Sequence, residues 1–242
     1  MDWNEEGIVL SARKHGETSA IVTLLTRGRG VHAGLVRGGS GKRKRGDLQP
    51  GNRVSAHWRG RLTEHLGSYT CELVLGYAAT LFDDADSLAG LSAALAVTES
   101  ALPEREEHPA VFDGLMVLLG SLETPDWPTL YVKWELGLLG ELGFGLDLQT
   151  CAATGIAEDL AYVSPKSGRA VSVSAAEPYL KSLLVLPPFL LDKGGAGSPE
   201  EIVDGMILTG YFLDRHVFGH SRHGKSPQAR QRLFDRLRRR LE

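Results

Sequence analysis

Short runs in which apolar and polar residues alternate occupy residues 7–76, and turns containing Gly or Pro separate them. Five such runs lie at residues 8–11, 19–26, 31–36, 53–58 and 68–75, and the run at 19–26 is rich in β-branched side chains. Short period-two runs bounded by turn residues are typical of β-strands. Five strands in so short a segment predict a small closed or nearly closed barrel. The pattern alone fits both an OB-fold and an SH3-like barrel.

Helical periodicity replaces this alternation from Asp83 onward. The first helix has leucines on one face and ends at Pro103, and a second begins near Pro109. A third helix begins at Asp126, with a proline just inside it, and stops at Gly143. Proline in the first turn and glycine after the last turn are common helix boundaries.

The helical pattern is interrupted over residues 146–174, where a turn at residues 165–168 predicts a small hairpin. Helices then resume, with capping boxes expected at Ser174 and Ser198 and a basic final helix opening at Ser226. We therefore expect an α+β multidomain chain with a hairpin module inserted into a helical domain. The expected domains are a β-barrel at 1–80, a helical domain formed by 81–145 and 175–242, and the hairpin module at 146–174.

Charge is segregated along the 242 residues although the net charge is only -3. Residues 1–80 carry +5, residues 81–221 carry -14 and residues 222–242 carry +6. Solubility alone gives no reason for this division, which favours a polyanionic partner for the basic parts. The chain has two cysteines, no basic leader followed by an apolar run, and no apolar segment of membrane-spanning length. These features predict a cytoplasmic protein without a disulfide framework.

The densest positive charge lies between residues 27 and 61, where ten basic residues accompany one acid, Asp47. The candidate nucleic-acid-binding residues of this stretch are Arg27, Arg37, Lys42, Arg43, Lys44, Arg45, Arg53, Trp58, Arg59 and Arg61. Lys42–Arg45 are expected to form a mobile loop that follows a phosphate backbone, and the strand arginines to set its path. Trp58 either stacks on a base or packs in the barrel core. The plainer alternative for the whole stretch is a solvated charged surface.

Catalytic machinery is not indicated by the sequence. The glycines before Lys42 resemble a phosphate-binding loop, but Val36 stands where its first Gly belongs and Arg43 where Ser or Thr belongs. No nucleophile is paired with a base at a recognisable spacing. We therefore expect a protein that is not an enzyme.

Several short motifs, in this order and spacing, resemble the bacterial RecO family. In the N-terminal part they are Glu6-Gly7-Ile8-Val9-Leu10, His15-Gly16-Glu17, Leu25-Thr26-Arg27, Val36-Arg37-Gly38 and Leu48-Gln49-Pro50. Further along they are Trp134-Glu135-Leu136, Glu141-Leu142-Gly143, Cys151-Ala152-Ala153-Thr154-Gly155 and Gly168. The resemblance covers nearly the whole chain.

The resemblance implies an N-terminal OB-fold, a helical C-terminal domain and a role as a recombination mediator. Such a mediator binds single- and double-stranded DNA, anneals complementary strands and helps load RecA onto DNA coated with single-stranded DNA-binding protein. The implied partners are RecR and the acidic C-terminal tail of the single-stranded DNA-binding protein. Candidate partner-binding residues here are Lys133, Trp134, Arg215 and Arg222.

One departure from the family concerns its four-cysteine zinc module. Of the four ligands only Cys151 is present, Thr154 stands at the second position, and residues 169–176 contain no cysteine. Structural zinc needs about four ligands, so we expect a hairpin without zinc and a protein without a cofactor. Two other functions stay open: an adaptor that docks an acidic protein, and an RNA-binding barrel.

Overall fold

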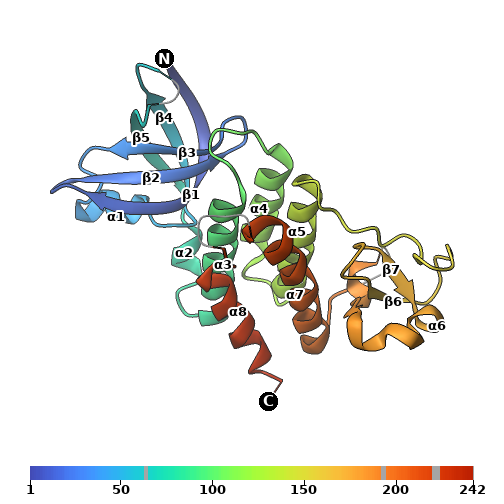
Figure 1. Ribbon diagram of the computed structural model, residues 1–242. Helices are drawn as coiled ribbons and strands as arrows, with labels where there is room; N and C mark the ends of the chain where they lie inside the picture. The colour runs from blue at the N-terminus through green and yellow to red at the C-terminus, as the bar shows by residue number, and fades with distance from the viewer. Residues whose placement is uncertain (63–64, 192–194, 220–223, 242) are drawn as a thin grey trace. The chain divides into compact units, whose positions relative to one another are not determined.

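The computed structural model describes residues 1–62, 65–191, 195–219 and 224–241 (Figure 1). Contacts divide the chain into two compact units, Met1–Glu123 and Thr124–Glu242. Helices α3 (Ala85–Ala101) and α4 (Pro109–Ser121), which the sequence analysis placed with the later helices, group with the barrel. The reason is packing of α3 on β1, where the Ser11 hydroxyl donates to Glu99 at 2.6 Å.

The first unit begins with a closed five-stranded barrel in the order β1-β2-β3-β5-β4. Its strands are β1 (Asp2–His15), β2 (Ser19–Thr26), β3 (Gly30–Val36), β4 (Arg53–Arg59) and β5 (Ser68–Leu75). All pairs are antiparallel except β3 with β5, which meet in parallel at Leu35 and Ser68. A short helix, α1 (Lys42–Asp47), lies between β3 and β4 in the chain. The expected OB-fold barrel is confirmed.

Strand β1 is much longer than the predicted run at residues 8–11. Its first half pairs with β4 and its second half with β2, so one strand closes the barrel on both sides. The first half reads as polar because Asp2, Asn4 and Glu6 are exposed, whereas Trp3 between them is partly buried. Pairing with β4 therefore extends the strand where the local sequence gives little apolar signal.

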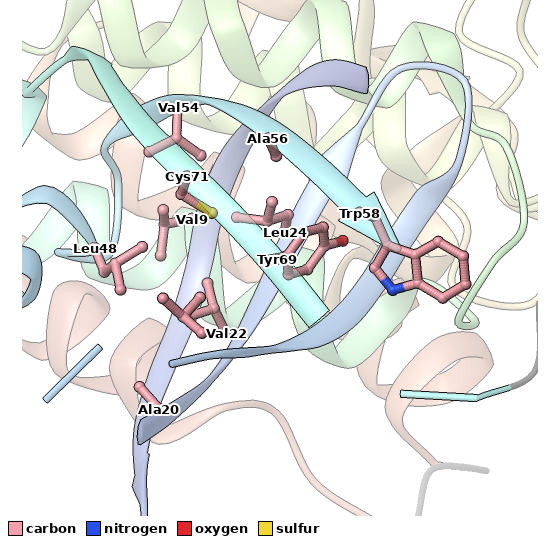
Figure 2. Close-up of a cluster of buried hydrophobic side chains, with 11 residues drawn as sticks. Val9, Ala20, Val22, Leu24, Leu48, Val54, Ala56, Trp58, Tyr69 and Cys71 are labelled. Carbon is pink, nitrogen blue, oxygen red and sulfur yellow. The ribbon is translucent and has the colours of Figure 1, made fainter. Parts of the chain in front are cut away.

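The barrel core runs from an α1 end to an aromatic end (Figure 2). Ala20 and Leu48 lie toward the α1 end, and Leu24 and Ala56 lie between them and Trp58. Cys71 is buried in this cluster, as expected for a small core residue. The α1 end is the one at Leu48, directly after α1, and the aromatic end is the one at Trp58 and Tyr69.

Three helices complete the first unit: α2 (Tyr77–Thr80), α3 and α4. Asp84 caps α3, because its carboxylate accepts the backbone N–H groups of Asp86 and Ser87. Pro109 stands in the first turn of α4, as the sequence pattern predicts.

The second unit combines helices with a small sheet in the order β7-β6-β8. Its elements are α5 (Trp127–Glu141), β6 (Leu160–Val163), β7 (Ala170–Ser172), α6 (Val173–Ala176), η1 (Glu177–Ser182), β8 (Leu184–Val185), η2 (Pro188–Leu190), α7 (Pro199–Leu213), η3 (Asp214–Phe218) and α8 (Gln228–Arg238). The predicted hairpin corresponds to β6 and β7. The capping box at Ser198 is confirmed. The one at Ser174 is wrong, because Ser174 lies inside α6, whose N-cap is Ser172.

Candidate nucleic-acid interface

The basic residues that are adjacent in sequence are divided between the two ends of the barrel. Lys42–Arg45 belong to α1, which gives the α1 end its name. Arg59 pairs in register with Asp2 and Ser68, one position beyond the Trp3 and Trp58 pair at the aromatic end. Arg61 follows in the turn after β4. The predicted DNA-binding residues thus form two basic regions rather than one surface.

Lys42–Arg45 are helical, so the prediction of a mobile loop is wrong. The Arg45 N–H donates to the Gly41 carbonyl at 2.8 Å, and the Leu48 N–H to Lys44 at 3.0 Å. Leu48 is buried and anchors the helix to the core. Glycines on both sides of the segment suggest a turn. Burial of Leu48, the hydrogen bond from Lys44 to the Cys71 carbonyl and the one from the Asn52 amide to the Gly46 carbonyl instead hold a short helix against the barrel.

Lys44 is occupied within the fold. Its ammonium group donates to the Cys71 carbonyl at 2.8 Å and lies 3.9 Å from the Asp47 carboxylate. Lys42, Arg43 and Arg45 are exposed, and within the described part of the chain their cationic groups have no acidic partner. These three side chains are therefore the ones on α1 that are free to meet phosphates.

A cavity of about 890 Å³ adjoins α1. Its charged lining residues are Lys14, Glu17, Lys42 and Arg45. Lys14, near the end of β1, was not among the predicted site residues because it lies outside the dense basic stretch. The cavity extends the basic region of the α1 end onto the β1–β2 hairpin.

Two predicted site arginines are held in surface ion pairs. Arg53 lies 2.8 Å from the Glu6 carboxylate, and Arg27 makes a forked pair with Asp113 at 3.0 Å. The hydrogen bond from Arg27 lowers the pKa of the Asp113 carboxyl. Exposed ion pairs contribute little to stability because water and salt screen them, so a phosphate can compete for either arginine. Arg37 is exposed in the turn after β3.

Trp58 is fully buried, so of its two predicted roles core packing is confirmed and stacking on a base is wrong. Its indole N–H donates to the Leu66 carbonyl at 3.1 Å. A Cβ on Gly67, which has φ +60°, would come within 2.4 Å of the indole ring. Leu66 and Gly67 therefore lie against Trp58, whose side chain packs in the core.

Four aromatic rings meet at this end of the barrel: Trp3, His32, Trp58 and Tyr69. Trp3 is stacked on Trp58 with centroids 6.0 Å apart and an interplanar angle of 16°. The Tyr69 hydroxyl lies 3.0 Å from His32 Nδ1. Burial, and then the charges of Arg105 and Arg29, lower the pKa of His32 to about 4. The imidazole is therefore neutral at physiological pH.

The candidate partner-binding residues of the second unit are not equivalent. Lys133 is exposed on α5, whereas Trp134 is buried, so the prediction of a surface role for Trp134 is wrong. Arg215 is exposed and donates to the Pro165 carbonyl at 2.9 Å and to the Tyr211 hydroxyl at 3.1 Å. It thereby ties η3 to the hairpin turn. Arg222 lies outside the described residues.

A buried ion pair in the second unit has no counterpart in the sequence predictions. Arg230 of α8 donates to both carboxylate oxygens of Glu135 on α5, at 2.7 and 2.8 Å, and to the Met206 carbonyl. The Thr209 hydroxyl donates to the same carboxylate at 2.5 Å. Such a pair is stabilising only when its remaining hydrogen bonds are satisfied, as they are here. It joins three helices that are far apart in sequence.

Cys151 is buried in the hairpin module among Leu160, Tyr162 and Val171. Its sulfur accepts hydrogen bonds from the N–H and the hydroxyl of Ser172, at 3.3 and 3.4 Å. Burial raises the pKa of the thiol, but hydrogen bonds from Ser172 and Thr154 outweigh burial and lower it to about 6. Among the described residues, no three His, Cys, Asp or Glu side chains are grouped to hold a metal ion. That the module folds without zinc stays a prediction.

No helix among the described residues is both long and apolar enough to cross a membrane.

Comparison with known proteins gives matches over both units. The family model described as "Recombination protein O N terminal" matches residues 1–77, and "Recombination protein O C terminal" matches residues 83–225. The chain is similar to the DNA repair protein RecO of Rhodospirillum centenum, with 56% identity covering 98% of this chain and 95% of that protein. It is also similar to the DNA repair protein RecO of Caulobacter vibrioides strain NA1000, with 51% identity covering 98% of each chain.

Proposed function

The chain belongs to the RecO family of DNA repair proteins, and we propose from this premise that it acts as a recombination mediator. In this role it binds single- and double-stranded DNA through the barrel, anneals complementary strands and helps load RecA onto DNA coated with single-stranded DNA-binding protein. It acts without catalytic chemistry of its own. Its proposed place of action is the cytoplasm, at the nucleoid.

The observation that carries the proposal is the exposed charge of Lys42, Arg43 and Arg45 on α1, which has no acidic partner among the described residues. Lysine and arginine side chains that contact phosphates release the counterions condensed on DNA, and this release drives binding without regard to sequence. A mediator that must act on any damaged site needs such sequence-independent binding. The cavity beside α1, with Lys14 on its other side, gives the backbone a track to follow.

Annealing follows from the same charge. Two complementary strands repel each other through their phosphates, and neutralising part of that charge on one protein lowers the repulsion. The basic regions at the two ends of the barrel offer separate places where two strands, or two parts of one strand, can be held. The bases are then left to pair with each other.

RecR and the acidic tail of the single-stranded DNA-binding protein are the proposed protein partners. For the tail, the exposed cations Lys133 and Arg215 of the second unit support the proposal, because an acidic peptide needs cations at its binding site. Trp134 is buried and is left out of this surface.

The test is a strand-annealing assay with complementary oligonucleotides, run with and without single-stranded DNA-binding protein. We expect the protein to accelerate annealing in both conditions. In parallel, the affinity for single-stranded DNA is measured against salt. Contact with about four to six phosphates predicts that log K falls against log salt with a slope of roughly -3 to -5.

Two outcomes would replace the proposal. A nearly flat salt dependence without annealing points to an adaptor that docks acidic proteins. Tighter binding of a matched RNA in direct competition with DNA points to an RNA-binding barrel.

A further inference from the structure

A second cavity, of about 290 Å³, lies at the aromatic end of the barrel. It is lined by Trp3, Gly28, Arg29, His32, Trp58, Arg105 and Glu107, all within the first unit. Proposed DNA contacts along α1 do not use it. Its lining combines flat aromatic rings with two guanidinium groups.

The aromatic wall of the cavity is held rigidly. Trp3 and Trp58 are direct cross-strand partners on β1 and β4, and Trp58 is fixed by its hydrogen bond to Leu66. His32 packs edge-on against both indoles, with centroids 5.3 and 5.2 Å away. Trp3 is the partly exposed member of this group, so it presents a pre-positioned aromatic surface at the cavity. A ligand that stacks there orders no side chain that is not already ordered.

The cationic rim is fixed by an unusual backbone. Arg105 has φ +66°, in the left-handed region, which is uncommon outside glycine. Its N–H donates to the Val31 carbonyl at 2.8 Å, so the loop is pinned to the start of β3. A Cβ on Gly30 would come within 1.8 Å of the Glu106 carbonyl oxygen, so only glycine permits this approach. Backbone strain that the surroundings enforce in this way is common where a side chain must be held in place for function.

The lining of the cavity carries two arginines and one glutamate. Arg29 and Arg105 are exposed, and Arg29 lies 3.5 Å from Glu5, whose carboxylate also accepts the Gly28 N–H. Burial lowers the pKa of the His32 imidazole, and the nearby positive charges of Arg105 and Arg29 lower it further. Glu107 is the acidic side chain among the lining residues. The cavity therefore suits a flat ring with an anionic group on one side and N–H donors on another.

We propose that this cavity binds one unstacked nucleobase of a single DNA strand, with the base against Trp3 and its phosphate on Arg29 and Arg105. Glu107 accepts a hydrogen bond from an exocyclic amino group of the base, which thymine lacks. The proposal rests on the proposed function, since it adds a base-binding subsite to the DNA-binding barrel. Arg59 and Arg61, at the same end of the barrel, would contact the phosphates of neighbouring nucleotides in the same DNA strand.

The experiment compares Trp3→Ala with wild type for binding of a short deoxycytidine strand, the same strand made abasic, and a duplex. Loss of one stacked base weakens binding by about 5- to 150-fold, so we expect that loss for the normal strand. The abasic strand and the duplex should bind both proteins alike. Trp3→Phe should restore most of the affinity, because phenylalanine keeps an aromatic face.

Controls separate stacking from folding and charge. Phe82→Ala removes an exposed aromatic side chain of the same unit that does not line the cavity, and should leave the affinity unchanged. Arg105→Ala removes an exposed side chain, so it tests the phosphate contact even if Trp3→Ala does not fold. It should weaken binding of the deoxycytidine strand, and Glu107→Gln should reduce the preference for deoxycytidine over thymidine.

Several results would overturn the inference. If folded Trp3→Ala and Arg105→Ala both bind the deoxycytidine strand as wild type does, the cavity is no base subsite, although the proposed function stands. If wild type binds no single-stranded DNA, the proposed function itself fails. If the two substitutions instead abolish binding only of a peptide that ends in an aromatic residue and its carboxylate, the cavity is a peptide site.

Discussion

Both ends of the barrel carry positive charge, but the structures that hold the basic side chains differ. At the α1 end, Lys42, Arg43 and Arg45 project from a short helix, which the buried Leu48 and the hydrogen bond from Lys44 to Cys71 hold against the barrel. At the aromatic end, Arg29 and Arg105 surround rings that are stacked, hydrogen-bonded and partly open. The exposed cations of the α1 end can contact a phosphate backbone in many geometries. The cavity of the aromatic end can accept a flat group in only a few orientations.

A dense run of charge in the sequence therefore does not define one surface of the barrel. The turn at residues 27–29 lies beside the cavity of the aromatic end, whereas Lys42–Arg45 lie at the α1 end. Strand β3 separates them in the chain. The packing beneath each basic region distinguishes the two: the buried Leu48 at the α1 end, and a cluster of aromatic rings at the aromatic end.

The largest effect that distinguishes the ends concerns stability. Trp58→Ala should lower the free energy of unfolding by about 3–5 kcal/mol, because it removes a fully buried ring and its hydrogen bond. Replacing Lys42, Arg43 and Arg45 together by alanine should leave that free energy nearly unchanged. Urea denaturation of the three proteins measures both. A fully stable Trp58→Ala protein would contradict the core role assigned to this residue.

The aromatic end should also make the protein sensitive to acid. His32 has a pKa of about 4 in the folded protein and about 6.5 when unfolded, so the unfolded state binds more protons between these values. Stability conferred by neutral His32 is therefore fully present above about pH 6.5 and is lost as the pH falls toward 4. Denaturation at a series of pH values should show this decline, and His32→Gln should flatten it. His15→Gln, at the exposed end of β1, is the control that should keep the wild-type decline.

The smallest expected effect concerns the ion pair between Arg27 and Asp113. Both side chains are more than half exposed, so Arg27→Ala should leave the free energy of unfolding nearly unchanged. If Arg27 leaves Asp113 to contact DNA, Arg27→Ala should also weaken DNA binding by the loss of about one phosphate contact. Asp113→Asn, which frees Arg27 without removing it, should then strengthen binding at low salt. No change in either variant would remove Arg27 from the interface.

The sequence pattern predicts the boundaries of a strand well where one of its faces is buried, and poorly where it is not. Strands β2 and β5 match the predicted runs at both boundaries. The first half of β1 was missed because its exposed residues are acidic or amide side chains, and α1 because glycines flank it. In each case, pairing or packing with a distant segment overrides the local preference.

The residues that matter at the aromatic end come from distant parts of the chain. Trp3, His32 and Arg105 meet only because the barrel closes and the loop after α3 docks on β3. The alternation of Trp3 with exposed neighbours was a usable signal for an inward residue. Arg105 offered none, since it lies in an acidic segment after Pro103. Likewise, no local pattern links Glu135 to Arg230, which are 95 residues apart.

The central claim is that charge acts at the α1 end and stacking at the aromatic end. Its most direct test is the salt dependence of single-stranded DNA binding by the triple alanine variant of Lys42, Arg43 and Arg45, beside Trp3→Ala. Lys166→Ala with Lys181→Ala, in the second unit, controls for charge alone and should match wild type. We predict that the triple variant flattens the slope of log K against log salt by about 2, whereas Trp3→Ala gives a parallel line at lower affinity. A parallel line for the triple variant and a changed slope for Trp3→Ala would contradict the account.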